Sequence, residues 1–302
     1  MYVIEAESLL ETIHRCLIDI PAIGQKVSPR DLATIEVRPA IIRISNPSWR
    51  VVCLPGRNAN PCFAAAETLW IISGSDDPWI FDYNRALLKY ANDGILKGAY
   101  GPRLRNWGGK DQIRWVIDVL RDDPASRRAV IQIFDPGSVD ISHNDIPCTI
   151  SFRFFIRDDR LCMHTLMRAN DIWLGMPYDV FCFTVIQEIV AYNLGIPMGD
   201  YVHMVDSLHI YETDLARAQD IAFNPDHLQE RFCRHHPIRI ALDKLNADFR
   251  LALANGRSIP AELDEYATLL RLYKARKADQ PTENSELDKL SPAFQEAFRI
   301  WR

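Results

Sequence analysis

Residues 161–179 read LCMHTLMRANDIWLGMPYD, and this stretch joins three local patterns. Its first seven residues are apolar or alternating, which predicts a β-strand that ends at Met167. The following residues place an arginine, an amide and two acids around an aromatic-rich turn that contains Gly175 and Pro177. Such a set of polar groups is costly to bury without a ligand. An apolar run from Val180 to Leu194 then predicts the longest helix of the chain.

Two upstream runs are expected to pair with the strand from Leu161 to Met167 in one sheet. Ala129 to Phe134 and Cys148 to Ile156 are both apolar or alternating, and the polar step from Arg157 to Arg160 predicts a hairpin turn. Two further strands are expected, over Ile35 to Ile44, with an edge or break at Pro39, and over Asp200 to Val205.

Helices are expected before, between and after these strands. Helical spacing predicts them over Ser8 to Ile20, over Pro61 to Ser73 with Gly74 at the C-terminal end, and over Asp111 to Arg121. Because helices and strands are mixed rather than strictly alternating, the expected fold class is α+β and not a doubly wound sheet.

The composition changes beyond about Asn224, where charge-rich helical patterns predict an appendage. We therefore expect a catalytic core over residues 1–222 and a helical C-terminal extension over residues 223–302, packed on the core. The helices expected in the extension cover Leu228 to Cys233, Ile240 to Asn255 and Pro260 to Lys277, followed by a terminal helix.

The composition of the whole chain excludes several classes of protein. Its 302 residues include 35 Lys and Arg, 40 Asp and Glu, and 48% hydrophobic residues, with a formal net charge of −5. This balance argues against a nucleic-acid partner but allows a small anion held by a few arginines. Without a run of about 18 uncharged apolar residues, no membrane partner is expected. The acidic N-terminal stretch and seven scattered cysteines, none in a CxxC pair, favour a reducing cytoplasmic location.

One of these cysteines stands in the run Asp145-Ile146-Pro147-Cys148-Thr149, at the start of a predicted strand. Most cysteines are inert buried thiols, and Cys148 considered alone fits that interpretation. Its surroundings favour a different one, because Arg168 and two acids follow the next strand. A cationic neighbour populates the thiolate, which is the nucleophilic form of cysteine.

Six segments, in order across residues 65 to 215, resemble the thymidylate synthase family. The stretch from 168 to 179 resembles that family's Arg-Ser-x-Asp-x-Phe-Leu-Gly-x-Pro-Phe-Asn, and Pro147-Cys148 resembles its nucleophile. The other four segments are Glu67-Thr68-Leu69-Trp70, Gly98-Ala99-Tyr100-Gly101, Asp123-Pro124-Ala125-Ser126-Arg127-Arg128 and His209-Ile210-Tyr211. Six ordered matches are far more specific than one motif. They imply a mixed sheet flanked by helices, 5,10-methylenetetrahydrofolate as cosubstrate and a homodimer.

The resemblance implies covalent catalysis, in which the Cys148 thiolate adds to C6 of a pyrimidine. Arg168 would lower the pKa of that thiol and bind the substrate phosphate. Glu67, on an apolar helix where burial raises a carboxyl pKa, is the implied general acid and base. The implied catalytic residues are Cys148, Glu67, Tyr100 and Asp179.

The resemblance also implies the residues that bind the two substrates. Arg127 and Arg128 would reach across a twofold axis to the phosphate bound by the partner subunit. At Arg30 the family's following glycine-rich stretch is replaced by Asp31-Leu32-Ala33-Thr34. The implied nucleotide-binding residues are Arg30, Arg127, Arg128, Arg168, Ala169, Asp179, His209 and Tyr211. The implied folate-binding residues are Asp171, Leu174, Gly175 and Tyr178, and no metal is expected.

Asp179 stands where the synthases have asparagine. An amide meets the O4 acceptor and N3 donor of uracil, whereas a carboxylate accepts from the C4 amino group of cytosine and from a protonated N3. We therefore expect the pyrimidine hydroxymethylase branch of the family, with water completing the reaction to 5-hydroxymethyl-CMP. Ala169 replaces a phosphate-binding serine, and CMP is favoured over dCMP. Thr149 replaces the histidine that commonly follows the nucleophile.

Three alternatives remain open at this point. One is synthase-type C5 methylation of dUMP or dCMP, and another is a non-catalytic pyrimidine nucleotide-binding protein. A metalloenzyme would depend on His227, His235 and His236, whose spacing matches no ligand motif.

Overall fold

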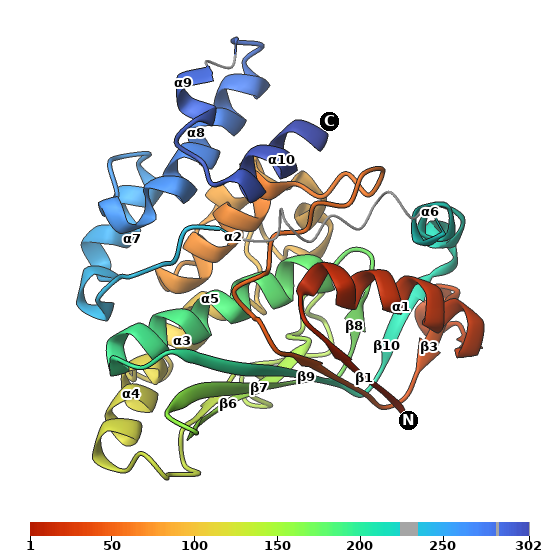
Figure 1. Cartoon of the computed structure of the whole chain (residues 1–302), viewed down its shortest axis with the longest axis horizontal. Helices are drawn as coiled ribbons and strands as arrows, with labels where there is room; N and C mark the ends of the chain where they lie inside the picture. The colour runs from red at the N-terminus through yellow and green to blue at the C-terminus, as the bar shows by residue number, and fades with distance from the viewer. Residues whose placement is uncertain (224–234, 282–283, 302) are drawn as a thin grey trace.

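The computed structural model describes residues 1–223, 235–281 and 284–301, and these residues form an α+β fold of two sheets and flanking helices (Figure 1). A six-stranded mixed sheet has the order β1-β4-β9-β7-β6-β5, and a four-stranded sheet has the order β2-β3-β10-β8. The strands are β1 Tyr2–Ala6, β2 Gln25–Val27, β3 Thr34–Val37, β4 Ala40–Ile44, β5 Val130–Gln132, β6 Thr149–Arg157, β7 Arg160–Met167, β8 Asn170–Asp171, β9 Met198–Val205 and β10 Leu208–Tyr211.

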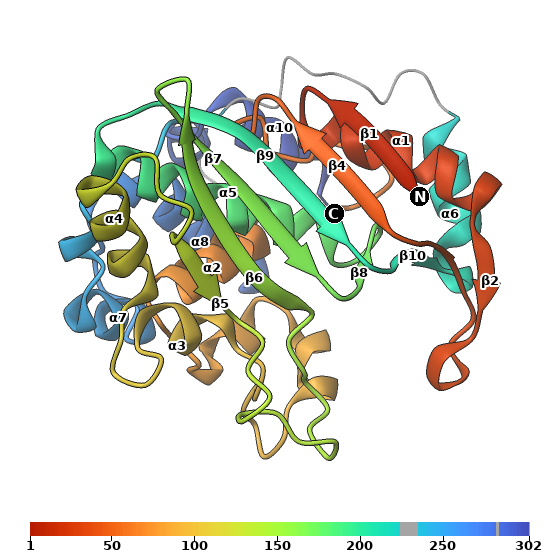
Figure 2. The ribbon, with the colours of Figure 1, turned by 90° about the horizontal axis from the view of Figure 1, so that it is seen from below.

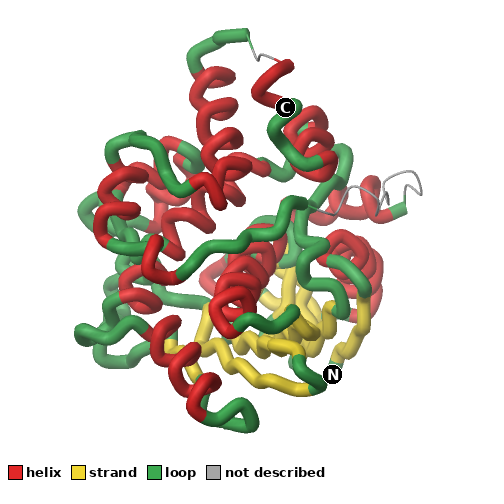
Figure 3. The backbone as a smooth tube through the Cα atoms, turned by 60° about the vertical axis from the view of Figure 1, so that its left-hand side comes forward, coloured by secondary structure: helices red, strands yellow, loops and turns green. Residues whose placement is uncertain are grey.

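Helices lie on one side of these sheets and at the top of the molecule (Figures 1 and 3). The α-helices are α1 Leu9–Ile23, α2 Pro61–Ile72, α3 Tyr100–Arg105, α4 Gln112–Asp122, α5 Met176–Leu194, α6 Glu212–Ala222, α7 Ala247–Ala254, α8 Asp264–Lys277, α9 Asn284–Leu287 and α10 Pro292–Ile300. Short 3₁₀ helices cover Pro29–Asp31, Pro78–Asp82, Arg85–Tyr90, Leu242–Lys244 and Ala261–Leu263.

The two sheets meet along a line where three strands pass from one sheet to the other. We call residues 38–39, 168–169 and 206–207 the sheet junction. On one side of it Val205 pairs with both Ala40 and Met167, and on the other Leu208 pairs with both Val37 and Asn170. The predicted strand from Ile35 to Ile44 is therefore two strands in different sheets, with the expected break at Pro39.

The predicted hairpin and the predicted N-terminal helices are confirmed. The β6–β7 turn uses Asp158 and Asp159 at φ values of 51° and 55°, a left-handed conformation that Asp tolerates better than most residues. Ser8 caps α1 by accepting a hydrogen bond from the Glu11 amide at 3.0 Å. The hydroxyl of Ser8 thus satisfies one of the free amides of the first helical turn.

The long helix begins earlier than predicted. Helix α5 starts at Met176 rather than Val180, because Pro177 sits in its first turn, where its missing N–H is not needed. This extension places Asp179 in the first turn, with its amide donating to the Gly175 carbonyl at 2.9 Å. Helix α5 is buried on nearly all sides because the six-stranded sheet lies below it and α2 lies above it (Figure 1).

The opposite face of the six-stranded sheet carries no helix among the described residues, as the view from below shows (Figure 2). Side chains on this face are only partly buried, although several are apolar, among them Phe155, Val202 and Met204. Phe155 packs on His164 with ring centroids 4.9 Å apart. This face is a large, partly apolar surface.

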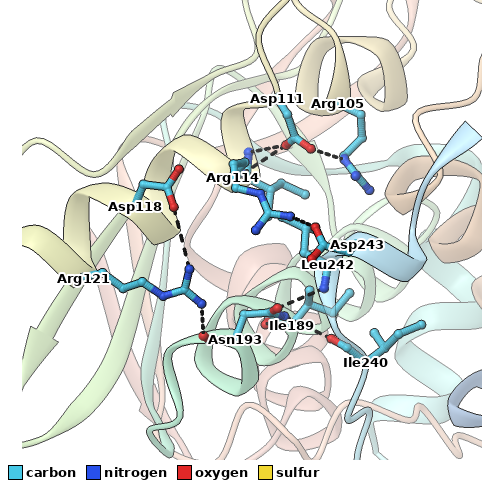
Figure 4. Close-up of polar contacts among 11 residues, drawn as sticks. Arg105, Asp111, Arg114, Asp118, Arg121, Ile189, Asn193, Ile240, Leu242 and Asp243 are labelled. Atoms are coloured by element: carbon cyan, nitrogen blue, oxygen red, sulfur yellow. Dashed lines mark hydrogen bonds and ion pairs between the residues drawn. The ribbon is translucent and has the colours of Figure 1, made fainter.

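The C-terminal helices pack on α2 through α7, α8 and α10. The helix predicted over Ile240 to Asn255 is only partly correct, because residues 238–241 are extended and the α-helix begins at Ala247. The cause is Asn193 at the end of α5: its side-chain amide donates to the Ile240 carbonyl at 3.0 Å, and its side-chain oxygen accepts from the Leu242 amide at 2.9 Å (Figure 4).

Helix α4 supports the same contact from the other side. Asp111 caps α4 by accepting from the amides of Ile113 and Arg114, both at 3.0 Å, at the start of the helix predicted over Asp111 to Arg121. Arg121 donates to the Asn193 carbonyl at 2.7 Å, and Arg114 forms an ion pair with Asp243.

The predicted helix from Pro260 to Lys277 begins as a 3₁₀ turn and becomes α-helical at Asp264, and the terminal helix is α10. The segment from Leu228 to Cys233 lies outside the described residues.

Candidate active site

The nucleophile segment is held by the arginine that follows the neighbouring strand. Cys148 comes directly before β6, and its carbonyl accepts a hydrogen bond from the Arg168 amide at 2.9 Å. The Arg168 guanidinium donates to the carbonyls of Pro147 at 3.0 Å and Ile146 at 2.9 Å. The same side chain is exposed on its outer side. Arg168 therefore orders the loop that carries the thiol and also faces solvent, where an anion can reach it.

The electrostatic environment of the thiol has two opposing parts. Burial raises the pKa of Cys148 above its ordinary value, and the positive charge of Arg168 opposes this effect. The carboxylates of Asp179 and Asp145 raise the pKa further, whereas Arg30 lowers it. The expected influence of Arg168 is present, but the net pKa of the thiol in the unliganded protein is raised, because burial outweighs the arginine.

Asp145 and Tyr100 connect the loop before α3 to the nucleophile segment. A carboxylate oxygen of Asp145 accepts from the Gly98 amide at 2.8 Å. The Tyr100 hydroxyl accepts from the Thr149 amide at 3.3 Å and from the Thr149 hydroxyl at 3.1 Å. Because Tyr100 is the acceptor in both contacts, its own proton is available to a bound molecule. Burial raises the pKa of Tyr100, so that proton is retained near neutral pH.

Glu67 extends from α2 toward α5 and has only weak protein partners. Its carboxylate receives a hydrogen bond from the Cys182 thiol at 3.8 Å, and that thiol also lies 3.1 Å from the Thr68 hydroxyl. Burial, with a smaller contribution from Asp179, raises the pKa of Glu67 to about 8. A carboxyl group with this pKa can both donate and accept a proton near neutral pH.

Asp179 lies in the first turn of α5 and is held by Asn170. The Asn170 side-chain amide donates to Asp179 Oδ2 at 2.7 Å. Burial raises the pKa of Asp179 to about 7, although this hydrogen bond opposes the rise. Asp179 also raises the pKa values of Glu67, Tyr100 and Cys148. The four residues predicted to be catalytic therefore gather in one place from α2, α3, the segment before β6, and α5.

The segment from Asp171 to Gly175 forms a tight turn beside Asp179. Asp171 Oδ1 accepts from the amides of Trp173 at 2.6 Å and Leu174 at 3.1 Å, whereas Asp171 Oδ2 is buried and has no hydrogen-bond partner among the residues that the structure describes. Burial raises the pKa of Asp171. Leu174, in the same turn, is 47% exposed. A ligand with an N–H donor beside an apolar ring fits this pair of features.

Tyr178 lies near the same turn but has a structural contact of its own. Its hydroxyl accepts from the Asn60 amide at 3.0 Å, and its ring packs edge-on against Phe63 at 4.9 Å. Arg57 donates to the Trp173 carbonyl and lies over the rings of Trp173 and Tyr178, with centroid distances of 5.0 and 5.9 Å. Arg57 was not predicted from the sequence, and it fixes the aromatic wall next to the turn.

The residues predicted to contact the sugar lie in the four-stranded sheet. His209 and Tyr211 are on one face of β10, with ring centroids 5.4 Å apart, as their spacing predicted. Tyr211 is close enough to Cys148, Asp171 and Arg30 for their charges to affect its pKa. Arg30 therefore lies within electrostatic range of the thiol, although its loop sequence departs from the family pattern.

Arg127 and Arg128 lie outside this group of residues. Both side chains are exposed just before β5, and neither forms a hydrogen bond or ion pair within the part of the chain that the structure describes. Ala169, by contrast, lies in the sheet junction next to Arg168 and is half-buried. Strand β5 is an edge of the six-stranded sheet, so the two arginines extend from that edge.

Sequence reasoning missed the polar residues behind Asp179. Asn170 was an unassigned position of the turn motif, and Tyr201 and His203 were assigned only to a strand. Both are fully buried on the face of β9 that packs against α5. Tyr201 and His203 share one face of the strand with Gly199 and Val205, and alternation along a strand places all four residues on the buried face. Because buried polar groups need hydrogen-bond partners, this pattern was a detectable sign of a buried polar network.

No group of three or more metal-binding side chains occurs among the described residues. His235 and His236 contact each other through a backbone carbonyl, and His227 lies outside the described part of the chain. Within the same residues, no helix has the length and apolar character needed to cross a bilayer.

Comparison with known proteins matches residues 19–230 to the family model described as thymidylate synthase. A protein of Bacillus phage SP01 named deoxyuridylate hydroxymethyltransferase is 36% identical over 206 residues, which cover 63% of this chain and 54% of that protein. A protein of Delftia phage PhiW-14 with the same name is 31% identical over 215 residues, which cover 66% of this chain and 59% of that protein. The chain thus spans little more than half the length of these curated relatives.

Proposed function

Since this chain belongs to the thymidylate synthase family, we propose that it transfers a one-carbon unit from 5,10-methylenetetrahydrofolate to C5 of a cytidine monophosphate and yields the 5-hydroxymethyl nucleotide. CMP is the favoured substrate and dCMP the second. The observation that carries this proposal is the carboxyl group of Asp179, beside the thiol and held by Asn170, at the position where the synthases have an amide.

The hydrogen-bonding pattern of cytosine supports the proposal. Cytosine presents an amino donor at C4 and an acceptor at N3. A carboxyl group that shares one proton with N3 meets both, because one oxygen accepts from the amino group and the other holds the shared proton against N3. Asp179 has a pKa of about 7, so it carries or releases that proton at neutral pH. Protonation at N3 also makes C6 more electrophilic.

The other residues then have defined roles. The Cys148 sulfur bonds to C6, which turns C5 into a carbon nucleophile. Glu67 and Tyr100 hold and move the proton that leaves C5 and the proton that water releases when its oxygen bonds to the new carbon, and the C6–S bond then breaks to return the Cys148 thiolate. Arg168 and Arg30 bind the phosphate, and His209 and Tyr211 bind the sugar.

When bound, methylenetetrahydrofolate supplies the one-carbon unit. The residues that would hold it are Asp171, through the Oδ2 atom that is unpaired among the described residues, the exposed Leu174, Gly175 and Tyr178.

The first experiment is a C5 exchange assay. Tritium release from C5 is measured with CMP, dCMP, UMP and dUMP in the presence of methylenetetrahydrofolate, and the mass of each product is determined. The proposal expects the fastest release from CMP and a product that has gained a hydroxymethyl group. Release from uridine nucleotides alone would contradict the assignment of the base, and a complete lack of release would favour a non-catalytic nucleotide-binding protein.

A second candidate is hydroxymethylation of deoxyuridylate, and the names of the two phage relatives favour it. A protonated Asp179 can donate to O4 of uracil and accept from N3–H, so a carboxyl group does not by itself exclude uracil. Replacing Asp179 with Asn separates the two candidates, because an amide in the orientation that the synthases use matches uracil and mismatches cytosine. A CMP enzyme should shift its preference toward uridine nucleotides by about 10²-fold or more. A deoxyuridylate enzyme should keep its preference.

The final step also distinguishes two chemistries. Synthase-type methylation of dUMP or dCMP would consume a hydride and leave dihydrofolate, which has its own absorbance. Addition of water leaves tetrahydrofolate. Following the folate product by absorbance while measuring the nucleotide mass tests the two in one reaction.

We further propose that the protein forms a homodimer through the open face of the six-stranded sheet, with Arg127 and Arg128 reaching the partner's phosphate. Subunit complementation tests this arrangement. Cys148→Ala and the double variant Arg127→Ala/Arg128→Ala should each be nearly inactive, whereas their mixture should regain activity, because one site per mixed dimer contains an intact thiol and intact arginines. A mixture as inactive as its components would contradict shared sites.

We also propose that residues 1–222 form the catalytic core and residues 223–302 an extension packed on it. The division would follow α6, and the family match ends nearby, at residue 230. The extension contacts α2, the helix that carries Glu67. Limited proteolysis should therefore cut first near residue 223.

A further inference from the structure

A chain of buried polar side chains runs from Asp179 into the centre of the fold. Asn170 donates to Asp179 Oδ2 at 2.7 Å, and Asn170 Oδ1 lies 2.9 Å from His203 Nε2. His203 Nδ1 lies 2.9 Å from the Tyr201 hydroxyl, which is also hydrogen-bonded to Thr165 Oγ1 at 3.0 Å. All the members behind Asp179 are buried, and three of them have no exposed surface.

The donors and acceptors available on these side chains fix the direction of the hydrogen bonds from Asn170 to Asp179 and from His203 to Asn170. Because Asn170 uses its NH₂ group on Asp179, its oxygen must accept a proton from His203 Nε2. Burial lowers the pKa of His203 to about 3, so the ring is neutral and Nδ1 is an acceptor. The Tyr201 hydroxyl is the group placed to donate to Nδ1. Because it has a single proton, the Thr165 hydroxyl then rotates to donate to the Tyr201 oxygen. The chain thus orients the amide of Asn170.

The hydrogen bond between Asn170 and Asp179 occupies the space that a side chain at Gly175 would need. A Cβ atom at Gly175 would lie 3.0 Å from Asp179 Oδ2 and 3.1 Å from Asn170 Nδ2. The backbone at Gly175 is in the ordinary helical region, so a glycine there is explained by this close approach and not by its φ value of −87°. Any larger residue would press directly on the hydrogen bond between the two side chains.

We propose that Asn170, oriented by His203, Tyr201 and Thr165, is a positioning and specificity-determining residue that makes the two oxygens of Asp179 unequal. Its amide keeps Oδ2 as an acceptor, so the proton that Asp179 shares with a base resides at Oδ1. If Oδ2 faces the substituent at C4, that substituent must be a donor, which is the amino group of cytosine. An unoriented carboxyl group would place its proton on either oxygen and accept an amino or an oxo group.

This inference rests on the proposed role of Asp179 in reading the base. Other groups also act on the Asp179 carboxyl, and they must be kept constant in any test. The ionisable groups close enough to interact with it are Glu67 on α2, Tyr100 on α3, Cys148 before β6, Asp171 on β8, Cys182 on α5 and Tyr201 on β9. None of these is altered in Asn170→Ala, and only Tyr201 is altered in Tyr201→Phe.

The experiment has two independent readouts. The first is the titration of Asp179 in nucleotide-free protein, followed by ¹³C NMR of carboxyl-labelled aspartate and assigned by the resonance that Asp179→Asn removes. The second is the ratio of kcat/KM for CMP to that for UMP. Both are measured in wild type, Asn170→Ala and Tyr201→Phe. Tyr266→Phe, which removes a buried hydroxyl elsewhere, serves as the matched control.

Loss of the Asn170 donor should raise the midpoint of the Asp179 titration by about one pH unit, since that hydrogen bond favours the ionised form. It should also lower the CMP to UMP ratio by about tenfold or more. Tyr201→Phe should shift both in the same direction by less, and Tyr266→Phe should shift neither. Tyr201→Phe keeps the ring in place, so it remains informative if Asn170→Ala does not fold.

The outcomes separate this inference from the proposed function. An unchanged midpoint in both network variants overturns the inference, whatever the substrate proves to be. A shifted midpoint with an unchanged base ratio overturns the specificity role if Asp179→Asn does change that ratio. If Asp179→Asn leaves the ratio unchanged, or if no nucleotide reacts, the proposed function fails, and the titration alone decides whether Asn170 controls the carboxyl group.

Discussion

Two regions of the molecule bury polar side chains, and they satisfy them to different degrees. Behind Asp179, the chain from Asn170 to Thr165 gives every ring nitrogen and amide a partner. The second region is the core–extension interface, which we define as Arg50, Glu188, His235, Glu265, Tyr266 and Ser291. Several buried polar atoms there have no hydrogen-bond partner within the described residues, namely Arg50 Nη1, His235 Nε2, Glu265 Oε2 and the hydroxyls of Tyr266 and Ser291.

This difference separates specificity from attachment. A fully satisfied buried network strengthens its own bonds and favours one geometry, which is useful where one carboxyl group must read a base. A partly satisfied cluster costs stability, and apolar residues can often replace it without loss. We therefore expect substitutions near Asp179 to change the reaction, and substitutions at the core–extension interface to change mainly the free energy of unfolding.

The largest effect is expected at the thiol. Cys148→Ala removes the atom that bonds to C6, so turnover should fall by more than about 10⁴-fold. The fold and nucleotide binding should survive, because the side chain is half-buried and the loop is held by Arg168 through backbone carbonyls. Single-turnover assays and calorimetric titration with CMP measure the two properties. Substantial turnover in the variant would exclude covalent catalysis by Cys148.

The next effect is expected at Arg50, whose guanidinium is fully buried and lies 2.9 Å from Glu188 Oε2. Arg50→Met leaves the Glu188 carboxylate buried without its partner, so the free energy of unfolding should fall by about 3–5 kcal/mol. The double variant Arg50→Met/Glu188→Leu is the control and should recover most of this loss. Urea denaturation measures both. If the double variant is as unstable as the single one, the ion pair is not separable from its packing.

Glu67 predicts a dependence of stability on pH. Its pKa is about 8 in the folded protein and about 4.5 in an unfolded chain, so the folded state binds the proton more tightly. The contribution of Glu67 to the free energy of unfolding is therefore fully present below pH 4.5 and is lost as pH rises through 8. Glu67→Gln should reduce the loss of unfolding free energy between pH 5 and 8 by on the order of 2 kcal/mol. Parallel denaturation curves at the two pH values provide the measurement.

The smallest effect compares the two regions directly with one chemical change. Tyr201→Phe deletes a hydroxyl that has partners on both sides and should cost about 1 kcal/mol of stability. Tyr266→Phe deletes a hydroxyl that has no hydrogen-bond partner within the described ranges, and it should be neutral or slightly stabilising. Thermal unfolding of the two variants beside wild type is sufficient. Equal losses in both would remove the distinction between a satisfied and an unsatisfied region.

Much of the fold and of the grouping of site residues could be predicted from local sequence. The β6–β7 hairpin, the helices α1 and α4 and the apolar helix α5 all followed from periodicity and turn chemistry, whereas the capping roles of Ser8 and Asp111 were seen only in the structure. Cys148, Glu67, Tyr100 and Asp179 carry motifs, and the structure brings them together. Their catalytic roles stay predictions until the variants are made.

The missing parts depend on contacts between distant residues. Nothing local shows that Asn193 binds the backbone at Ile240 and Leu242 and so keeps residues 238–241 out of the helix that was predicted there. The partners of Asn170 come from β9, more than thirty residues away, and no spacing rule joins them. The net pKa of Cys148 could not be predicted either, because it depends on how deeply the thiol is buried as well as on Arg168.

The sheet junction limits how this protein can change in length. The chain crosses it three times, each time in a step of two residues, at 38–39, 168–169 and 206–207, and the strand registers agree on both sides. Side chains alternate between the faces of a strand, so one inserted or deleted residue in any step would turn over every side chain beyond it. At 168–169 such a change would turn Asp171 and Asn170 away from their partners. Among natural variants, the number of residues in each step should therefore stay constant, and at Arg168, which also holds the nucleophile loop, the residue should stay the same as well.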